Sequence, residues 1–188
     1  MDDDHDHDHD HDHGHEHDHS LIVDRLPAGS WRVDPEGSEV LFRARTLRVV
    51  PVHGLFRDFS GELEVAEDGA ASGTLLIQTG SLDTRIARRD RTLRGPQYLD
   101  AQRHPTATFT LARIEPSGRE HLNVTGTLQL AGHSVPLSLE AYAIAHGDHL
   151  HLEAQTPIDQ TAAGLGWAKP GLVGNTVRAE VALTLTRA

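Results

Sequence analysis

The chain has 188 residues, which is enough for one ordinary domain and a short extension. Its formal net charge is −11, but residues 1–20 contain nine acids and no Lys or Arg, so the rest of the chain carries only −2. A body this close to neutral gives no electrostatic case for nucleic-acid binding. Because cysteine is absent, disulfides, zinc fingers, iron–sulfur clusters and thiol catalysis are excluded. No stretch approaches the roughly 20 apolar residues of a membrane-spanning helix.

The first 20 residues differ from the rest of the chain, because they are almost entirely His and Asp. Such a polar segment has no apolar surface whose burial could offset the entropy lost on ordering. We therefore expect residues 1–20 to be a disordered tail. A linker over residues 21–29 joins it to a domain over residues 30–188. The tail lacks the basic start and apolar core of a signal peptide, so we expect a cytoplasmic protein.

Histidine occupies every odd position of this tail from 5 to 19. Neutral imidazole suits Zn²⁺, Ni²⁺ and Cu²⁺, and neighbouring carboxylates can complete the coordination shell. The sequence therefore predicts that the tail binds divalent transition metals; a purification tag is the alternative interpretation. The candidate metal ligands are His5, His7, His9, His11, His13, His15, His17 and His19.

From Ser30 onward, apolar residues recur with period two, as in strands that bury one face. Val40, Phe42 and Ala44, for example, alternate with charged residues at 39, 43 and 45. Further alternating runs cover residues 74–79, 108–111, 121–130, 149–155 and 177–185. Turn signals separate these runs, at 34–37, 67–69, 116–118, 131–132 and 146–148. The pattern predicts an all-β meander, sandwich or barrel of antiparallel strands.

One segment departs from this rhythm. Residues 85–94 show helical rather than alternating spacing. Thr84 or Asp83 can cap the first turn, and Gly95-Pro96 can end the helix. We therefore predict a single short helix, packed on or across the sheet.

About eight strands would close into a barrel, which removes the edges that an open sheet must protect. A barrel of this size either fills its interior with side chains or keeps a slot for one ligand. The chain has only four Phe, two Tyr and two Trp, which are few large side chains for a solid core. The expected dry faces also carry many small residues, which favours a slot: Ala44, Gly54, Gly61, Gly73, Gly126, Ala141, Ala143, Ala154 and Ala179.

Several motifs, in this order and spacing, make the chain resemble the YceI-like family from Trp31 to about Thr186. The most specific is Ser81-Leu-Asp83-Thr84 followed by Arg89-Asp90-Arg-Thr-Leu93. The others include Trp31-Arg-Val-Asp34-Pro35, Val52-His-Gly54-Leu-Phe56, Tyr98-Leu-Asp100, His104-Pro105 and Val124-Thr-Gly126-Thr-Leu128. The resemblance implies a lipocalin-like, eight-stranded antiparallel β-barrel whose interior holds polyisoprenoid lipids, including quinone tails. It also implies binding or transport, often by a dimer.

With this resemblance in view, we expect a lumen that binds an isoprenoid-type lipid, although ordinary core packing is the alternative for any one position. Arg89 is expected at the mouth, where it holds a polar or phosphate head group; the alternative is a structural pair with Asp90 that ties the helix to the barrel. The expected ligand-binding residues are Val40, Phe42, Phe56, Leu63, Leu75, Ile77, Arg89, Phe109, Leu111, Leu128, Leu137, Leu139, Leu152, Trp167 and Val181.

Three functions follow from these observations. The main hypothesis is a non-enzymatic isoprenoid-lipid carrier that requires no cofactor. The alternatives are a cytoplasmic Zn²⁺ or Ni²⁺ buffer with the barrel as scaffold, and a small enzyme acting on a lipid head group. No G-x-S-x-G, H-E-x-x-H, P-loop or Rossmann pattern is present. His149 and His151 could chelate an ion with His146, but alternation favours a solvated face for them.

Overall fold

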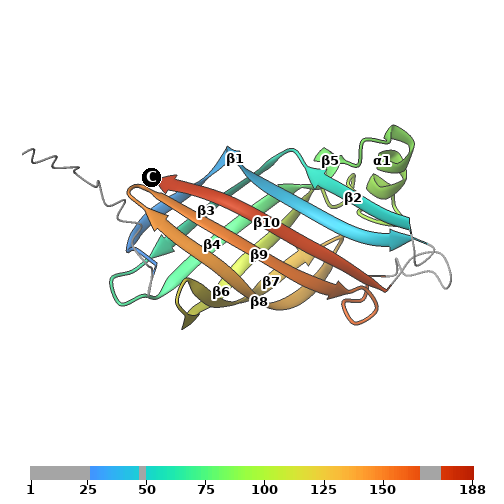
Figure 1. Cartoon of the computed structure of the whole chain (residues 1–188). Coiled ribbons are helices and arrows are strands. Elements are labelled where there is room, and N and C mark those ends of the chain that lie inside the picture. Colours follow the sequence, from blue (N-terminus) through green and yellow to red (C-terminus); the bar gives the residue numbers. More distant parts are fainter. Residues whose placement is uncertain (1–25, 47–49, 166–174) are drawn as a thin grey trace, which may run out of the picture.

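The computed structural model describes residues 26–46, 50–165 and 175–188, and their strands form a barrel (Figure 1). The helix α1 (Ala87–Arg94) and the 3-10 turn η1 (Thr79–Ser81) lie between β4 and β6. The strands are β1 (Gly29–Thr46), β2 (Val50–Phe56), β3 (Phe59–Val65), β4 (Ala71–Gln78), β5 (Leu82–Asp83), β6 (Thr106–Gly118), β7 (His121–Leu130), β8 (His133–His146), β9 (His149–Asp159) and β10 (Thr176–Arg187).

The sheet closes because β10 pairs with β1, where Val181 lies opposite Val40. Eight strands form the ring in the order β1-β3-β4-β6-β7-β8-β9-β10, and all pairings are antiparallel. The predicted eight-stranded antiparallel barrel with one short helix is therefore confirmed. β2 and β3 pair in succession with the long β1, with only residues 57–58 between them. The short β5 pairs with β2 next to α1.

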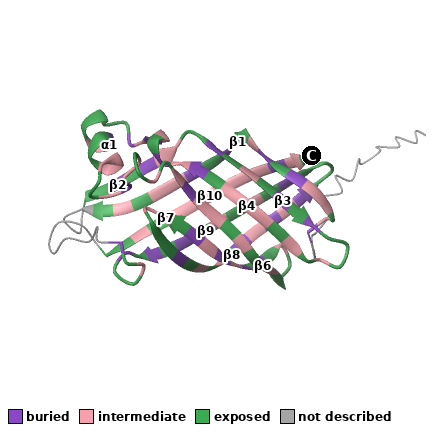
Figure 2. Ribbon diagram, turned by 180° about the vertical axis from the view of Figure 1, so that it is seen from behind, coloured by how far each residue is buried: buried purple, intermediate pink, exposed green. Residues whose placement is uncertain are grey.

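Burial alternates along the strands, as the sequence predicted, because one face of the sheet lines the interior (Figure 2). In β7, residues 122, 124, 126 and 128 are buried, while residues 121, 123 and 129 are exposed. β3, β8 and β9 alternate in a similar way, and apolar side chains from all the ring strands meet in one shared interior.

Two predicted turns are wrong, because the chain stays in β-structure there. Residues 34–37 form a bulge inside β1, where the register with β10 shifts. The hydroxyl of Ser38 donates to the carbonyl oxygen of Asp34 at 2.6 Å and accepts the N–H of Thr184 at 2.9 Å, which fixes the bulge against β10. Residues 116–118 are likewise the end of β6.

The predicted helix is present, but its expected cap is wrong. α1 begins after Ile86, which makes no side-chain capping hydrogen bond, and neither Asp83 nor Thr84 is the N-cap. Its end is as predicted, with Gly95 as the C-cap. Among the described residues, no helix has the length and apolar character that crossing a lipid bilayer requires.

Large side chains close the end of the barrel that contains the start of β1 and the C-terminus, opposite α1 (Figure 1). Trp31 is only 1% exposed, and Leu150 and Leu185 beside it are also fully buried. The indole N–H of Trp31 donates to the carbonyl oxygen of Pro27 at 3.1 Å, and the guanidinium of Arg187 lies over the ring, 4.9 Å from its centroid. These side chains fill the interior at that end.

Candidate functional site

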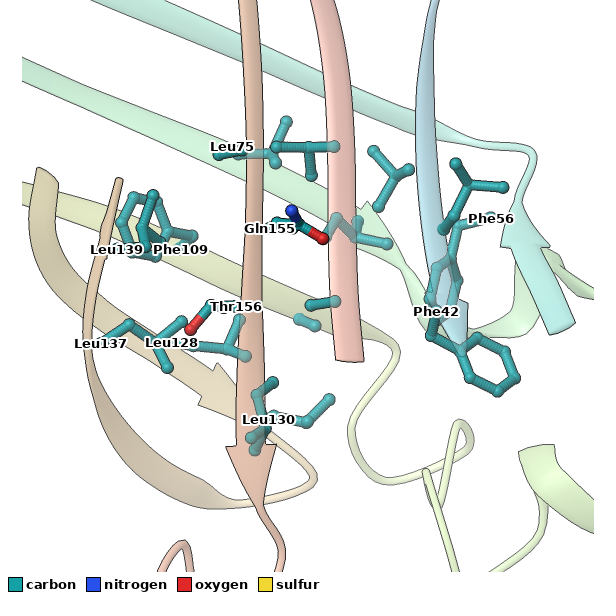
Figure 3. A pocket seen from close by; sticks show the side chains of 18 of the residues that line it. Phe42, Phe56, Leu75, Phe109, Leu128, Leu130, Leu137, Leu139, Gln155 and Thr156 are labelled. Carbon is teal, nitrogen blue, oxygen red and sulfur yellow. The ribbon is translucent and has the colours of Figure 1, made fainter. Parts of the chain in front are cut away.

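The barrel contains an apolar cavity of about 440 Å³, within the usual range for a small-molecule site. All eight ring strands contribute inward side chains to its lining, and α1 contributes Arg89, Thr92 and Leu93. Figure 3 shows Leu75 of β4, Phe109 of β6 and Leu128 of β7, with Leu137 and Leu139 of β8, directed into this shared space.

Fourteen of the fifteen expected ligand-binding residues lie in the described part of the chain, and each of them lines this cavity. Their contact with a ligand stays a prediction. They are Val40, Phe42, Phe56, Leu63, Leu75, Ile77, Arg89, Phe109, Leu111, Leu128, Leu137, Leu139, Leu152 and Val181. Trp167 and the eight histidines at positions 5–19 lie outside the described residues.

The cavity stays open partly because its phenylalanine rings lie against glycines in the wall. A methyl group placed on Gly54 would be 2.2 Å from Cε1 of Phe42, and one on Gly126 would be 2.4 Å from Cζ of Phe109. Each ring therefore occupies the space that a side chain on the neighbouring strand would use. Lying against the wall in this way, the rings provide apolar surface without spanning the lumen (Figure 3).

Alanines keep the middle of the lumen wide. Ala154 of β9 lies directly opposite Ala141 of β8 and Val181 of β10, and all three line the cavity. Ala179 of β10, which lies opposite Phe42, is a further lining residue. Because a small side chain reaches only a short way inward, these positions leave space that a longer residue would fill.

Polar side chains near the α1 end of the cavity are held by a network that joins the helix to the segment before it. The buried carboxylate of Asp90 accepts the N–H of Thr84 at 2.9 Å and its hydroxyl at 2.5 Å. Arg89 donates to the hydroxyl and to the carbonyl oxygen of Thr84, both at 2.9 Å. Arg94 donates to the carbonyl oxygen of Leu82. Among the described residues no ion pair joins Arg89 to Asp90; both instead bond to Thr84, which ties α1 to the segment before it, and Arg89 also lines the cavity.

The carboxylate of Asp83 fixes the backbone before this network. It accepts the N–H of Arg85 at 2.7 Å and pairs with the guanidinium of Arg57 at 2.9 Å. These bonds, the Arg85 amide first, hold the pKa of the Asp83 carboxyl below its ordinary value. Arg85 itself has φ of 62°, a left-handed conformation that is uncommon outside glycine, and the bond to Asp83 stabilises it.

Several cavity residues were missed by the sequence reasoning. Leu82, Leu93 and Leu99 line the cavity from β5, α1 and the loop after it. None of them belongs to an alternating run, so period two gave no signal for them. The one signal that could have identified them is their apolar character within residues 81–100, the segment that carries the most specific family motifs. Thr156, a polar residue on an inward position of β9, also lines the cavity (Figure 3).

Metal binding by the folded body has no support in the described geometry. His146, His149 and His151 are all exposed, as expected for a solvated face. Among the described residues, no group of three or more His, Cys, Asp or Glu side chains is arranged to hold an ion.

A closed eight-stranded barrel around an apolar cavity defines the class of calyx-shaped binding barrels. The family model described as the YceI-like domain matches residues 31–185, and the chain belongs to this family. The resemblance predicted from the sequence is therefore confirmed.

Curated relatives share this stretch at moderate identity. Protein YceI of Escherichia coli O157:H7 is 37% identical over 125 residues, which cover 64% of this chain and 65% of that protein. Protein YceI of Salmonella newport (strain SL254) is 35% identical over the same shares of the two chains. The matched stretch thus spans just under two thirds of the length of these relatives.

Solved structures agree on the fold. BcnA of Burkholderia cenocepacia is 25% identical, with a TM-score of 0.75 over 81% of this chain and 98% of that one. A polyisoprenoid binding domain from Saccharophagus degradans, implicated in plant cell wall breakdown, is 18% identical, with a TM-score of 0.66 over 84% of this chain and 98% of that one. At 18% identity, the latter likeness shows the fold alone.

Proposed function

We propose that the protein is a non-enzymatic carrier that holds a long isoprenoid-type lipid, such as a polyprenyl or quinone tail, in the barrel. The observation that carries the proposal is the apolar cavity of about 440 Å³ inside a closed barrel. The Saccharophagus protein, a polyisoprenoid binding domain with the same fold, supports this ligand class.

The energetics favour an apolar chain as the occupant. Each buried methylene contributes about 0.8 kcal/mol, so several isoprene units would gain well over 10 kcal/mol before ordering costs. Such a lining recognises length and shape rather than polar groups, so selectivity among neighbouring chain lengths should be loose.

We assign Arg89 to the polar end of this lipid. Its side chain is half-buried and lines the cavity beside α1. A guanidinium has five N–H donors, and Thr84 accepts two hydrogen bonds from it. The remaining donors suit an oxygen of a head group, and the bonds to Thr84 orient them in advance.

The test is equilibrium binding of polyprenols and isoprenoid quinones of graded chain length to the delipidated protein. We expect saturable one-to-one binding that tightens with chain length until the cavity is filled. Arg89→Gln should weaken binding of a polyprenyl phosphate more than binding of the matching polyprenol. Absence of saturable binding for every chain length would refute the carrier function, and steady conversion of any ligand would favour the enzyme alternative.

We also propose that the histidines at positions 5–19 bind Zn²⁺, Ni²⁺ or Cu²⁺ independently of the barrel. Protons compete for the same imidazoles, so binding should weaken sharply below neutral pH. Calorimetric titration of Zn²⁺ into the full chain and into a form without residues 1–20 tests this, and equal stoichiometry in both would contradict it. Full metal loading of a protein that binds no lipid would favour the buffer alternative. A cytoplasmic location and a homodimer remain predictions.

A further inference from the structure

Arginines crowd the end of the barrel that carries α1. Residues 83–94 contain five arginines and only two aspartates. Arg85, Arg88 and Arg91 are exposed, and none of the ion pairs within residues 26–46, 50–165 and 175–188 involves them. Arg88 and Arg91, three residues apart, lie on neighbouring positions of the helix surface.

The acids in and after this segment have other partners, although Asp83 is also attracted by the charge of Arg85. Asp90 is buried and accepts two hydrogen bonds from Thr84. Asp83 pairs with Arg57 at 2.9 Å, and Asp100, whose side chain is 14% exposed, lies 3.7 Å from Arg103. The local excess of positive charge is therefore presented to solvent by the exposed side of α1 and the residue before it.

Exposed aliphatic side chains accompany this charge. Ile86, the N-cap residue of α1, is 50% exposed, and Val50 at the start of β2 is 47% exposed. Only one further large hydrophobic side chain in the described part of the chain, Leu76, is comparably exposed. A helix rich in exposed arginines, with the exposed Ile86 at its start, has the composition of a surface that lies on anionic lipid head groups.

The opposite end of the barrel has a different character. Its turns carry Glu67 and Asp68 between β3 and β4, Arg119 and Glu120 between β6 and β7, and Asp148 between β8 and β9, so acids outnumber basic residues there. Positive charge is thus gathered near α1, which lies at one end of the barrel (Figure 1), and is not spread evenly over the described residues. An anionic surface attracted by these arginines would therefore meet the α1 end of the barrel rather than its side wall.

We propose that Arg85, Arg88 and Arg91, together with Ile86, form a docking surface for anionic phospholipid bilayers. The surface places the α1 end of the cavity against the membrane, where an apolar ligand can pass between bilayer and barrel without crossing water. Its purpose rests on the proposed carrier function, but the docking itself requires no bound ligand.

The test measures partition of the full chain onto vesicles of phosphatidylcholine alone and of phosphatidylcholine with phosphatidylglycerol. We expect binding to the anionic vesicles at low salt, weakening as salt rises, and none to the neutral ones. The combined variant Arg85→Gln, Arg88→Gln, Arg91→Gln should bind roughly 100-fold more weakly, from about 1 kcal/mol per arginine at the surface. Ile86→Ser should lower binding about three- to tenfold.

A matched control removes three exposed arginines elsewhere: Arg32→Gln, Arg113→Gln and Arg119→Gln. It changes the net charge equally and should leave partition within about threefold, because salt screens distant charges. Equal losses of vesicle binding in both triple variants would overturn the proposal. It would also be overturned if the protein bound a single-stranded oligonucleotide more tightly than anionic vesicles and Ile86→Ser left vesicle binding unchanged. Thermal unfolding confirms that each variant is folded.

The experiment separates docking from ligand binding. Vesicle partition is measured on delipidated protein, while binding of polyprenol in detergent is measured on the same variants. The arginine variants should keep their affinity for polyprenol, because Arg89 and Arg94, which bond to Thr84 and Leu82, are left in place. If the unmodified protein partitions onto anionic vesicles but does not bind polyprenol, the carrier function alone is refuted. If it binds polyprenol but does not partition, docking alone is refuted.

Discussion

Ala154→Leu tests whether the interior is hollow, because the sign of its effect on stability depends on the answer. Ala154 lines the cavity opposite Ala141 and Val181. Leucine adds three carbon atoms, each contributing about 0.8 kcal/mol when buried, less about 0.5–1 kcal/mol for side-chain ordering. The free energy of unfolding of the lipid-free protein should therefore rise by about 1.5–2 kcal/mol, and Tm by about 3–8 °C.

Ala143→Leu is the matched control on the neighbouring strand. Ala143 is 1% exposed and, within the described barrel, lies outside the cavity lining. The added carbons must there displace packed atoms, which should destabilise the protein by about 1–3 kcal/mol. Urea unfolding of both delipidated variants, with unchanged m-values, gives the comparison. A loss of stability in Ala154→Leu as large as that in Ala143→Leu would show that the lumen has no free space at this position.

Other predictions concern the wall, the helix network and acid stability. Gly126→Ala would place a methyl group 2.4 Å from Phe109 and should cost about 1–3 kcal/mol in urea unfolding, whereas wild-type stability would show that the ring has room to move. Thr84→Val removes the hydroxyl that donates to the buried Asp90 carboxylate and should lower the free energy of unfolding by about 1–3 kcal/mol. Thr84→Ser, which keeps the hydroxyl, is the control. Equal stability of the two variants would contradict the network. Folding lowers the pKa of Asp83, so its ionised carboxylate stabilises the folded protein. This stabilisation is complete above the ordinary pKa of 3.8 and is lost as the pH falls through the lower pKa of the folded state. Asp83→Asn should therefore flatten the acid limb of the stability–pH profile, and an unaltered limb would count against this role.

The alternating strands could be predicted from the sequence because their burial follows a local rule. Phe109 and Leu111, two residues apart in β6, both line the cavity, as period two requires. Small residues at inward positions, such as Ala154, likewise indicate an open interior from the sequence alone. Turn signals were less reliable. At residues 34–37 the Asp34 side chain does accept the N–H of Glu36, yet the segment stays in β1, where Ser38 bonds to Thr184, 146 residues away.

The α1 end of the cavity could be predicted only in part. The helix itself follows from spacing, but Thr84 bonds to Asp90 instead of capping the first turn. The contact of Phe42 with Gly54 depends on the pairing of β1 with β2, which sequence spacing does not specify. Sequence alone could therefore identify the wall of the cavity more readily than the groups that border its end.

Native mass spectrometry of the protein as isolated is the sharpest test of the carrier function. We expect a population heavier than the bare chain by several hundred daltons, whose extra mass is extracted by hexane and identified as an isoprenoid. This extra mass should be diminished in Ala154→Leu. Bare polypeptide alone, with no binding when a polyprenol is supplied during refolding, would contradict the claim that an apolar guest fills the barrel.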